Sequence, residues 1–187
     1  TLDRPDWSIL DLDPKDAPFA HVVEVARATR ALCRTIGLPS LIKTSGSSGL
    51  HVMVPLGRQC GYEEARALAE LLARVVVAQL PEIATITRQV SRRGGKVYLD
   101  YGQNGAGRLL VAPFSVRPLP GAPVSTPLRW SEVNDKLDIR KFTIRTVPPR
   151  MKKLRTDPLA EVLTLEPDLG HALEELGRPG RKWNRLT

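Results

Sequence analysis

The 187-residue sequence has little that would cross-link the chain, anchor it in a membrane or export it. Its two cysteines, Cys33 and Cys60, form no CxxC pair, so neither a zinc site nor a disulfide framework is predicted. No apolar run approaches the ~18 residues of a membrane span, and no signal peptide is recognisable. These absences predict a cytoplasmic protein with no membrane partner. The GxxxxGK[ST] phosphate-binding loop and internal repeats are also missing.

Acidic residues are too few in the second part of the chain to balance its basic residues. Residues 1–80 contain nine Lys and Arg and nine Asp and Glu, whereas residues 81–187 contain nineteen and eleven. The net charge of +8 and the pI near 9.9 therefore arise in the second part. This asymmetry suggests a polyanionic partner such as nucleic acid. A solvated basic surface that maintains solubility is the alternative.

The composition, 42% hydrophobic and 26% charged, is that of a globular domain with one core. Apolar spacing and turn residues predict strands at 7–13, 39–44 and 50–56, helices at 18–37 and 61–80, and two further strands at 84–90 and 95–101 around a turn at 92–95. This order is a split βαβ unit, which indicates an α+β, ferredoxin- or RRM-like fold. Short helices are predicted between residues 157 and 176.

Three carboxylates end two of the predicted strands. Asp11 and Asp13 close the first strand and Asp100 closes the last. Alternation along a strand puts Asp11 and Asp13 on one face, and Asp100 reaches that face if the register allows. In the expected topology the first strand is central, and antiparallel pairing brings Asp13 near His51, at the start of the third strand. Oxygen ligands of this kind suit Mg²⁺ or Mn²⁺.

The segment from Lys43 to His51 (KTSGSSGLH) is a flexible turn with three serines, a lysine before it and a histidine after it. Such a turn can direct N–H groups and positive charge at phosphate oxygens. Ser/Gly hairpins also occur as plain turns, and paired acids at a strand end also cap helices. DxD signals occur in glycosyltransferases and phosphatases too, although Lys15 does not fit the phosphatase pattern.

Three stretches together resemble a known family: WSILDLDP (residues 7–14), KTSGSSGLHVMVPL (residues 43–56) and residues 97–130. They are similar to the polymerase domain of bacterial ligase D, in the archaeo-eukaryotic primase superfamily. The resemblance runs from about Arg4 to Leu176, which implies a catalytic domain at 1–176 and a basic linker or tail at 177–187. It implies a primase-polymerase fold with extra strands and C-terminal helices, and a template-directed nucleotidyltransferase that fills gaps and extends ends in non-homologous end joining.

The resemblance also assigns roles to individual residues. Asp11, Asp13 and Asp100 match the family's metal ligands, which implies a two-metal site for Mn²⁺ or Mg²⁺. His51 matches the histidine that contacts the phosphates of the incoming nucleotide. Three residues of the same motif would line the triphosphate, and two arginines after the third acid are candidates for phosphate or template contact: Lys43, Ser45, Ser48, Arg108 and Arg117.

The partners implied by the family are DNA, as primer–template, gaps and double-strand break ends, and an NTP or dNTP. Ligase and nuclease domains and the Ku end-binding protein are further implied partners, in the bacterial cytoplasm at the nucleoid. Family members carry an N-terminal segment with a pocket for the downstream 5′-phosphate, and this chain begins just before the aspartates. A truncated form, whose activity and 5′-phosphate recognition are in question, is therefore expected.

Two other functions remain open from the residues alone. One is a non-catalytic RRM-like nucleic-acid-binding module, and the other is a different DxD metal-dependent phosphotransferase. The stretch from Lys136 to Arg155 has eight Lys and Arg against Asp138 alone, which fits either a contact surface for the DNA backbone or a solvated surface.

Overall fold

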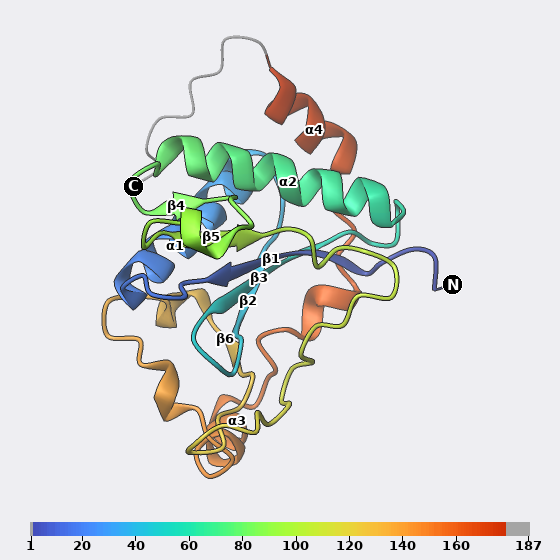
Figure 1. Ribbon diagram of the computed structural model, residues 1–187. Helices are drawn as coiled ribbons and strands as arrows, with labels where there is room; N and C mark the ends of the chain where they lie inside the picture. The colour runs from blue at the N-terminus through green and yellow to red at the C-terminus, as the bar shows by residue number, and fades with distance from the viewer. Residues whose placement is uncertain (1, 179–187) are drawn as a thin grey trace.

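A mixed β-sheet forms the centre of the computed structural model, which describes residues 2–178 (Figure 1). Its strands are β1 (Trp7–Asp13), β2 (Leu41–Thr44), β3 (Leu50–Pro55), β4 (Ala84–Thr85), β5 (Val97–Asp100) and β6 (Pro127–Leu128). In the described part of the chain they lie in the order β4-β5-β1-β3-β2-β6. The four central strands, with α1 (Phe19–Thr35) and α2 (Tyr62–Gln79) as connections, form the expected split βαβ unit.

The sheet buries one face against α1 and α2 (Figure 1). Alternate residues of the central strands point into this core, among them Leu10, Leu12, Ile42, Val52 and Leu99. The two helices cover the face because their apolar residues recur at helical spacing, such as Val22, Val25, Ala26, Leu32 and Cys33 on α1. Cys33 is therefore a core residue, as its position in the helical pattern predicts.

The opposite face of the sheet is divided into an apolar end and a polar end. At the apolar end, Ile9 and Met53 pack against Leu159 and Val162, the latter in a short 3₁₀ helix at Ala160–Leu163. Further along the same faces of the strands lie the acids, His51 and Lys43. Strand alternation thus gives each central strand one apolar face and one face that changes from apolar to polar.

The prediction of a strand at residues 84–90, the first strand of a hairpin with residues 95–101, is wrong. β4 has only two residues and pairs with β5 in parallel, while residues 90–92 form a 3₁₀ turn. The chain folds around the buried Arg93, whose guanidinium donates to the carbonyl oxygens of Thr87 and Arg88 at 3.2 Å each. An extended strand could not direct both carbonyls at one side chain, so this contact replaces the hairpin.

After β5 the chain covers the polar end of the sheet and adds β6 at the edge beside β2. Later elements include α3 (Val147–Leu154) and α4 (Leu169–Gly177), so the short helices predicted after residue 156 are present. In the basic stretch, Arg140 and Arg150 pair with Asp138 and Glu132. The predicted linker is described only to residue 178, and residues 179–187 lie outside the described chain. Among the described residues, no helix has the length and apolar character needed to cross a membrane.

Gly49 lies where β3 begins beside the end of β1, and a Cβ there would collide with the carbonyl oxygen of Leu12. We therefore expect Gly49→Ala to lower the free energy of unfolding by about 1–3 kcal/mol, because the strands must separate to admit the methyl group. Chemical denaturation measures the change. Gly177→Ala is the control, since nothing lies within 4 Å of the Cβ added there. Equal stability of Gly49→Ala and the parent protein would contradict the close approach.

Candidate active site

A row of directly paired residues crosses the polar end of the sheet. Lys43 is the partner of His51, His51 of Asp11, and Asp11 of Asp100. Direct partners in antiparallel strands project from the same face, so the row places these four side chains side by side. The register confirms that Asp100 shares a face with Asp11. His51, expected near Asp13, lies directly opposite Asp11 and lines the same pocket as Asp13.

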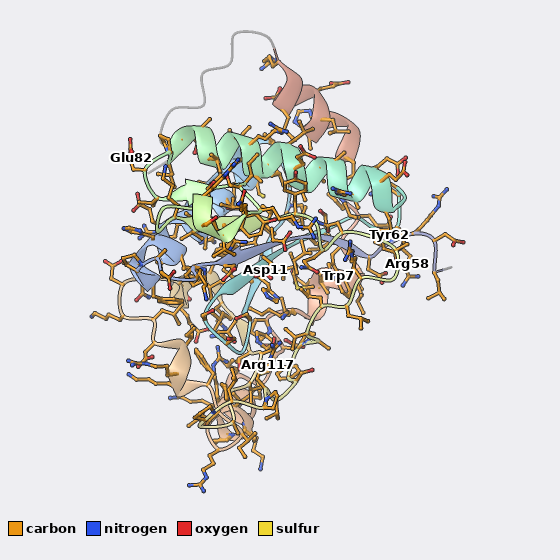
Figure 2. The ribbon with its side chains drawn as sticks, viewed as in Figure 1. Trp7, Asp11, Arg58, Tyr62, Glu82 and Arg117 are labelled. Carbon is orange, nitrogen blue, oxygen red and sulfur yellow. The ribbon has the colours of Figure 1, made fainter. Side chains whose placement is uncertain are left out.

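A pocket of about 380 Å³ opens over this row. Seven of the nine predicted site residues line it: Asp11, Asp13, Asp100, Ser45, Ser48, His51 and Arg117. Figure 2 shows Asp11 near the middle of the molecule and Arg117 below it, on the segment that follows β5. Lys43 and Arg108 do not line this pocket. Residues from three motifs far apart in the sequence therefore meet in one hollow.

Each of the three carboxylates already has a partner within the protein. Asp13 Oδ2 accepts a hydrogen bond from Arg93 Nη1 at 2.8 Å. Asp100 Oδ1 accepts from the Gly102 amide at 2.8 Å, and its Oδ2 accepts from Gln103 Nε2 at 3.0 Å. Asp11 Oδ1 faces His51 Nε2 at 3.4 Å. These contacts offset the repulsion between acids on one face.

The donor chemistry of the three acids fits a hard divalent cation, since all are carboxylates on adjacent strands that line the same pocket. In their present orientations they do not form a ligand cluster. Between residues 2 and 178, no group of three or more His, Cys, Asp or Glu side chains is arranged to hold an ion. Cation binding would require Asp13 and Asp100 to exchange Arg93 and Gln103 for the metal.

The serine turn is held in shape by Ser45. Its Oγ accepts hydrogen bonds from the amides of Ser47 at 3.1 Å and Gly49 at 3.0 Å. Gly46 has a φ of +73°, which favours glycine, and a Cβ there would lie 2.8 Å from Arg117 Cγ. The turn therefore brings Arg117 close to the serines, with Ser47 and Ser48 exposed at the pocket.

Lys43 is not available to a triphosphate, which corrects the sequence-based expectation. Its side chain is fully buried, and Nζ lies 2.9 Å from His51 Nδ1 and 2.7 Å from Ser125 Oγ. Burial lowers the pKa of Lys43 to about 7; the Asp11 carboxylate opposes this shift and Arg117 adds to it. Ser125 donates in turn to the carbonyl oxygen of Thr44. Lys43 therefore contacts His51 on the side away from the pocket and does not line the pocket itself.

These contacts select one tautomer of His51. Below pH about 7 Lys43 is an ammonium group, which has no acceptor, so His51 Nδ1 accepts from Lys43 and the ring proton resides on Nε2. The Asp11 carboxylate, which faces Nε2, favours the same tautomer. Burial lowers the pKa of His51, a shift that its contact with Asp11 opposes. His51 thus presents a neutral N–H donor at the edge of the pocket.

Sequence reasoning missed three side chains that shape the acidic site. Arg93 lies over the Tyr98 ring, 4.0 Å from its centroid, and Tyr98 donates to Asp100 Oδ1 at 3.2 Å. Burial raises the pKa of Tyr98 to about 12, and the Asp100 charge adds to the shift. Gln103 holds Asp100 from the other side. The sequence predicts a turn at Arg93, and nothing in its local pattern indicates a contact with Asp13.

Asn104, four residues after the third acid, has a structural role. Its side-chain amide accepts from the backbone N–H of Ile9 at 2.7 Å and donates to the Ile9 carbonyl at 2.8 Å. The amide thereby continues the pairing of β1 beyond the end of β5. This bond fixes the loop after β5 beside the pocket.

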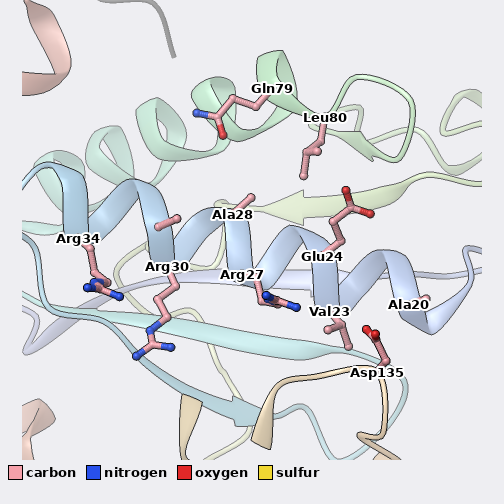
Figure 3. A pocket seen from close by; sticks show the side chains of 11 residues that line it. Ala20, Val23, Glu24, Arg27, Ala28, Arg30, Arg34, Gln79, Leu80 and Asp135 are labelled. Carbon is pink, nitrogen blue, oxygen red and sulfur yellow. The ribbon is translucent and has the colours of Figure 1, made fainter. Parts of the chain in front are cut away.

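A larger hollow of about 490 Å³ lies along α1 on the helical side of the sheet. Figure 3 shows Arg27, Arg30 and Arg34 extending from α1 to the side away from Gln79. None of the three sequence motifs contributes to its lining. We therefore place the candidate active site at the smaller, acidic pocket.

Comparisons with known proteins agree on one family. The family model described as "LigD, primase-polymerase domain" matches residues 1–159. The "Multifunctional non-homologous end joining protein LigD" of Pseudomonas aeruginosa is 33% identical over 180 residues, which are 95% of this chain and 21% of that protein. The "Bifunctional non-homologous end joining protein LigD" of Bacillus subtilis is 36% identical over 152 residues, 80% of this chain and 25% of the relative.

One solved structure is similar over most of the chain. It is described as "Polymerase Domain from Mycobacterium tuberculosis Ligase D in complex with DNA". The TM-score is 0.80 and the sequences are 32% identical, with 88% of this chain and 57% of that chain covered. The likeness bears out the α+β primase-polymerase fold.

The contact between Lys43 and His51 can be tested with Lys43→Met, which keeps the length of the side chain but removes the donor. We expect the ¹⁵N NMR signals of the His51 ring, recorded below pH 7 where Lys43 is charged, to report a protonated Nε2 in the parent protein and a mixture of tautomers in the variant. Lys152→Met, on the exposed surface of α3, is the control. The same mixture in both variants would contradict the assignment.

The lowered pKa of Lys43 also predicts a pH dependence of stability. Between pH about 7 and 10.5 the unfolded chain holds the proton and the folded protein does not. Unfolding therefore takes up a proton in this range, and raising the pH disfavours it, so the free energy of unfolding should rise. Urea denaturation between about pH 7 and 8, below the titration of the cysteine thiols in the unfolded chain, checks this. We expect Lys43→Met to lose the rise, and a rise that persists unchanged would assign it to another group.

Proposed function

The chain belongs to the LigD primase-polymerase domain family, and from this premise we propose that it is a template-directed nucleotidyltransferase of non-homologous end joining. The observation that carries the proposal is the meeting of Asp11, Asp13 and Asp100 with His51 and the serine turn in one pocket. Carboxylates beside a phosphate-binding type of turn are what nucleotide transfer needs. In this role the protein fills gaps and extends DNA ends.

The proposed partners extend beyond this chain, which spans about a fifth to a quarter of the curated relatives it matches. DNA is supported by the similar polymerase domain, whose description places it in complex with DNA. An NTP or dNTP is the second substrate. Ligase and nuclease domains and the Ku protein are proposed partners in repair, in the bacterial cytoplasm.

We assign Asp11, Asp13 and Asp100 as the residues that would hold a pair of Mn²⁺ or Mg²⁺ ions. Ions so bound lower the pKa of an attacking 3′-hydroxyl and neutralise the pyrophosphate that leaves. The acids supply the negative charge that retains such ions. Direct pairing across β1 and β5 puts Asp11 and Asp100 on one face, and alternation along β1 puts Asp13 there too.

The remaining residues of the pocket bind and orient the triphosphate. His51 donates from Nε2–H to a phosphate oxygen, while Arg117, which lies beside the serine turn, adds positive charge. The serine turn offers hydroxyl groups in the same pocket. Phosphoryl transfer depends chiefly on such positioning and charge compensation, so a nucleophilic serine is unnecessary. Lys43 contributes indirectly by keeping His51 in the donor form.

The two alternatives from the sequence have no observation in their favour. An RRM-like binding module would not require three acids on one face, and another DxD phosphotransferase would not require a template. Primer extension separates all three functions, because only the polymerase lengthens a primer according to the template strand.

We expect Asp100→Asn to reduce templated primer extension by at least about a hundredfold, since the variant retains the shape of the side chain but loses a charge at the reacting phosphate. Extension is measured with labelled nucleotides and Mn²⁺. Mn²⁺ binding to the protein, measured by electron paramagnetic resonance, should weaken in the same variant.

Asp135→Asn is the matched control, because Asp135 lies on the other side of the molecule, at the hollow along α1. It should extend primers at the parent rate. If the parent protein binds Mn²⁺ and nucleotide but never extends a primer, the polymerase proposal fails. If Asp100→Asn extends as well as the parent, the assignment of the acids fails.

A further inference from the structure

A second, smaller hollow lies on the other side of Asp100 from the serine turn. It has a volume of about 140 Å³ and shares Tyr98, Asp100 and Gln103 with the active-site pocket. Three arginines from separate elements line it: Arg66 on α2, Arg88 after β4 and Arg108 after β5. The third acid therefore stands between two hollows, one with His51 and the serines and one with arginines.

The three guanidinium groups are not balanced by acids of their own. Among residues 2–178, no ion pair with an Asp or Glu side chain involves Arg66, Arg88 or Arg108. Arg66 lies over the Tyr101 ring, 5.8 Å from its centroid, which holds it at the hollow. Three exposed arginines gathered beside one small hollow repel each other, and an anion between them would relieve that repulsion.

The order of the strands indicates which anion the three arginines would bind. The groups suited to a triphosphate, His51 and the serine turn, lie on the β2–β3 side of Asp11, and the arginines lie beyond β5 on the opposite side. In nucleotide transfer the attacking and leaving oxygens are roughly in line across the reacting phosphorus. The strand that supplies the 3′-hydroxyl must therefore approach from the side away from the pyrophosphate, which is the side of β5.

We propose that Arg66, Arg88 and Arg108 form a subsite for the phosphodiester backbone of the strand that is extended. The inference rests on the proposed polymerase function. It places the nucleotide on the β2–β3 side of the acids and the extended strand on the β5 side. A guanidinium group can donate two parallel hydrogen bonds to a phosphate group. Such backbone contacts do not depend on the base sequence, as a primer site requires. Arg108, expected to contact phosphate or template, is thereby assigned to the primer.

The test compares Arg66→Gln, Arg88→Gln and Arg108→Gln with Arg27→Gln, which removes the same charge from α1 on the helical side of the sheet. Binding of a fluorescent primer–template is measured by anisotropy over a range of salt concentrations, without nucleotide. We expect each subsite variant to weaken binding about tenfold at low salt and to reduce the salt slope by about one. Arg27→Gln should change neither quantity.

Steady-state extension then distinguishes the primer from the nucleotide. We expect the KM for primer to rise in the three variants while the KM for nucleotide and nucleotide binding without DNA stay at parent values. A rise in the nucleotide KM instead would assign the arginines to the triphosphate and overturn the proposal. So would unchanged primer binding in all three variants. Because anisotropy requires no turnover, failure of this subsite is distinguishable from failure of the polymerase function, which would abolish extension in the parent protein.

Discussion

Asp11 is paired directly with His51 on one side and with Asp100 on the other, and the chemistry of the polar end follows from this register. A shift of one residue in either pairing would turn one of these side chains into the core between the sheet and α1. Gly49 permits the close approach of β1 and β3 at this point, because any side chain there would collide with the Leu12 carbonyl oxygen. The acids converge because the backbone is paired in this way, despite their mutual repulsion.

That repulsion is offset by cations and donors supplied from other segments. Arg93 pairs with Asp13, Gln103 and the Gly102 amide hold Asp100, and His51 faces Asp11. The buried Lys43 extends the series by one strand and binds Ser125, which connects the segment before β6 to the row. Each of the three acids therefore has a hydrogen-bond or ion-pair partner within the protein. These are the contacts that a bound metal or substrate would replace.

The division of the open face into two ends also organises the substrates. At the apolar end Ile9 and Met53 pack against the segment that contains the 3₁₀ helix at Ala160–Leu163, and the acidic pocket lies at the polar end. There the sheet order sets a direction, with His51 on one side of the acids and the edge of β4 and β5 on the other. The proposed sites for the nucleotide and the extended strand thus lie on opposite sides of the acids.

The central strands, both long helices and the three motifs could be predicted from the sequence, because alternation, helical spacing and turn residues are local properties of the chain. The shared face of Asp11 and Asp13 followed for the same reason. The partner of His51, the burial of Lys43 and the contact of Arg93 with Asp13 required the tertiary structure, since each depends on which residue of a distant strand or loop lies opposite. Register and burial are decided by the packing of the whole sheet, and no local pattern near Lys43 or Arg93 records it.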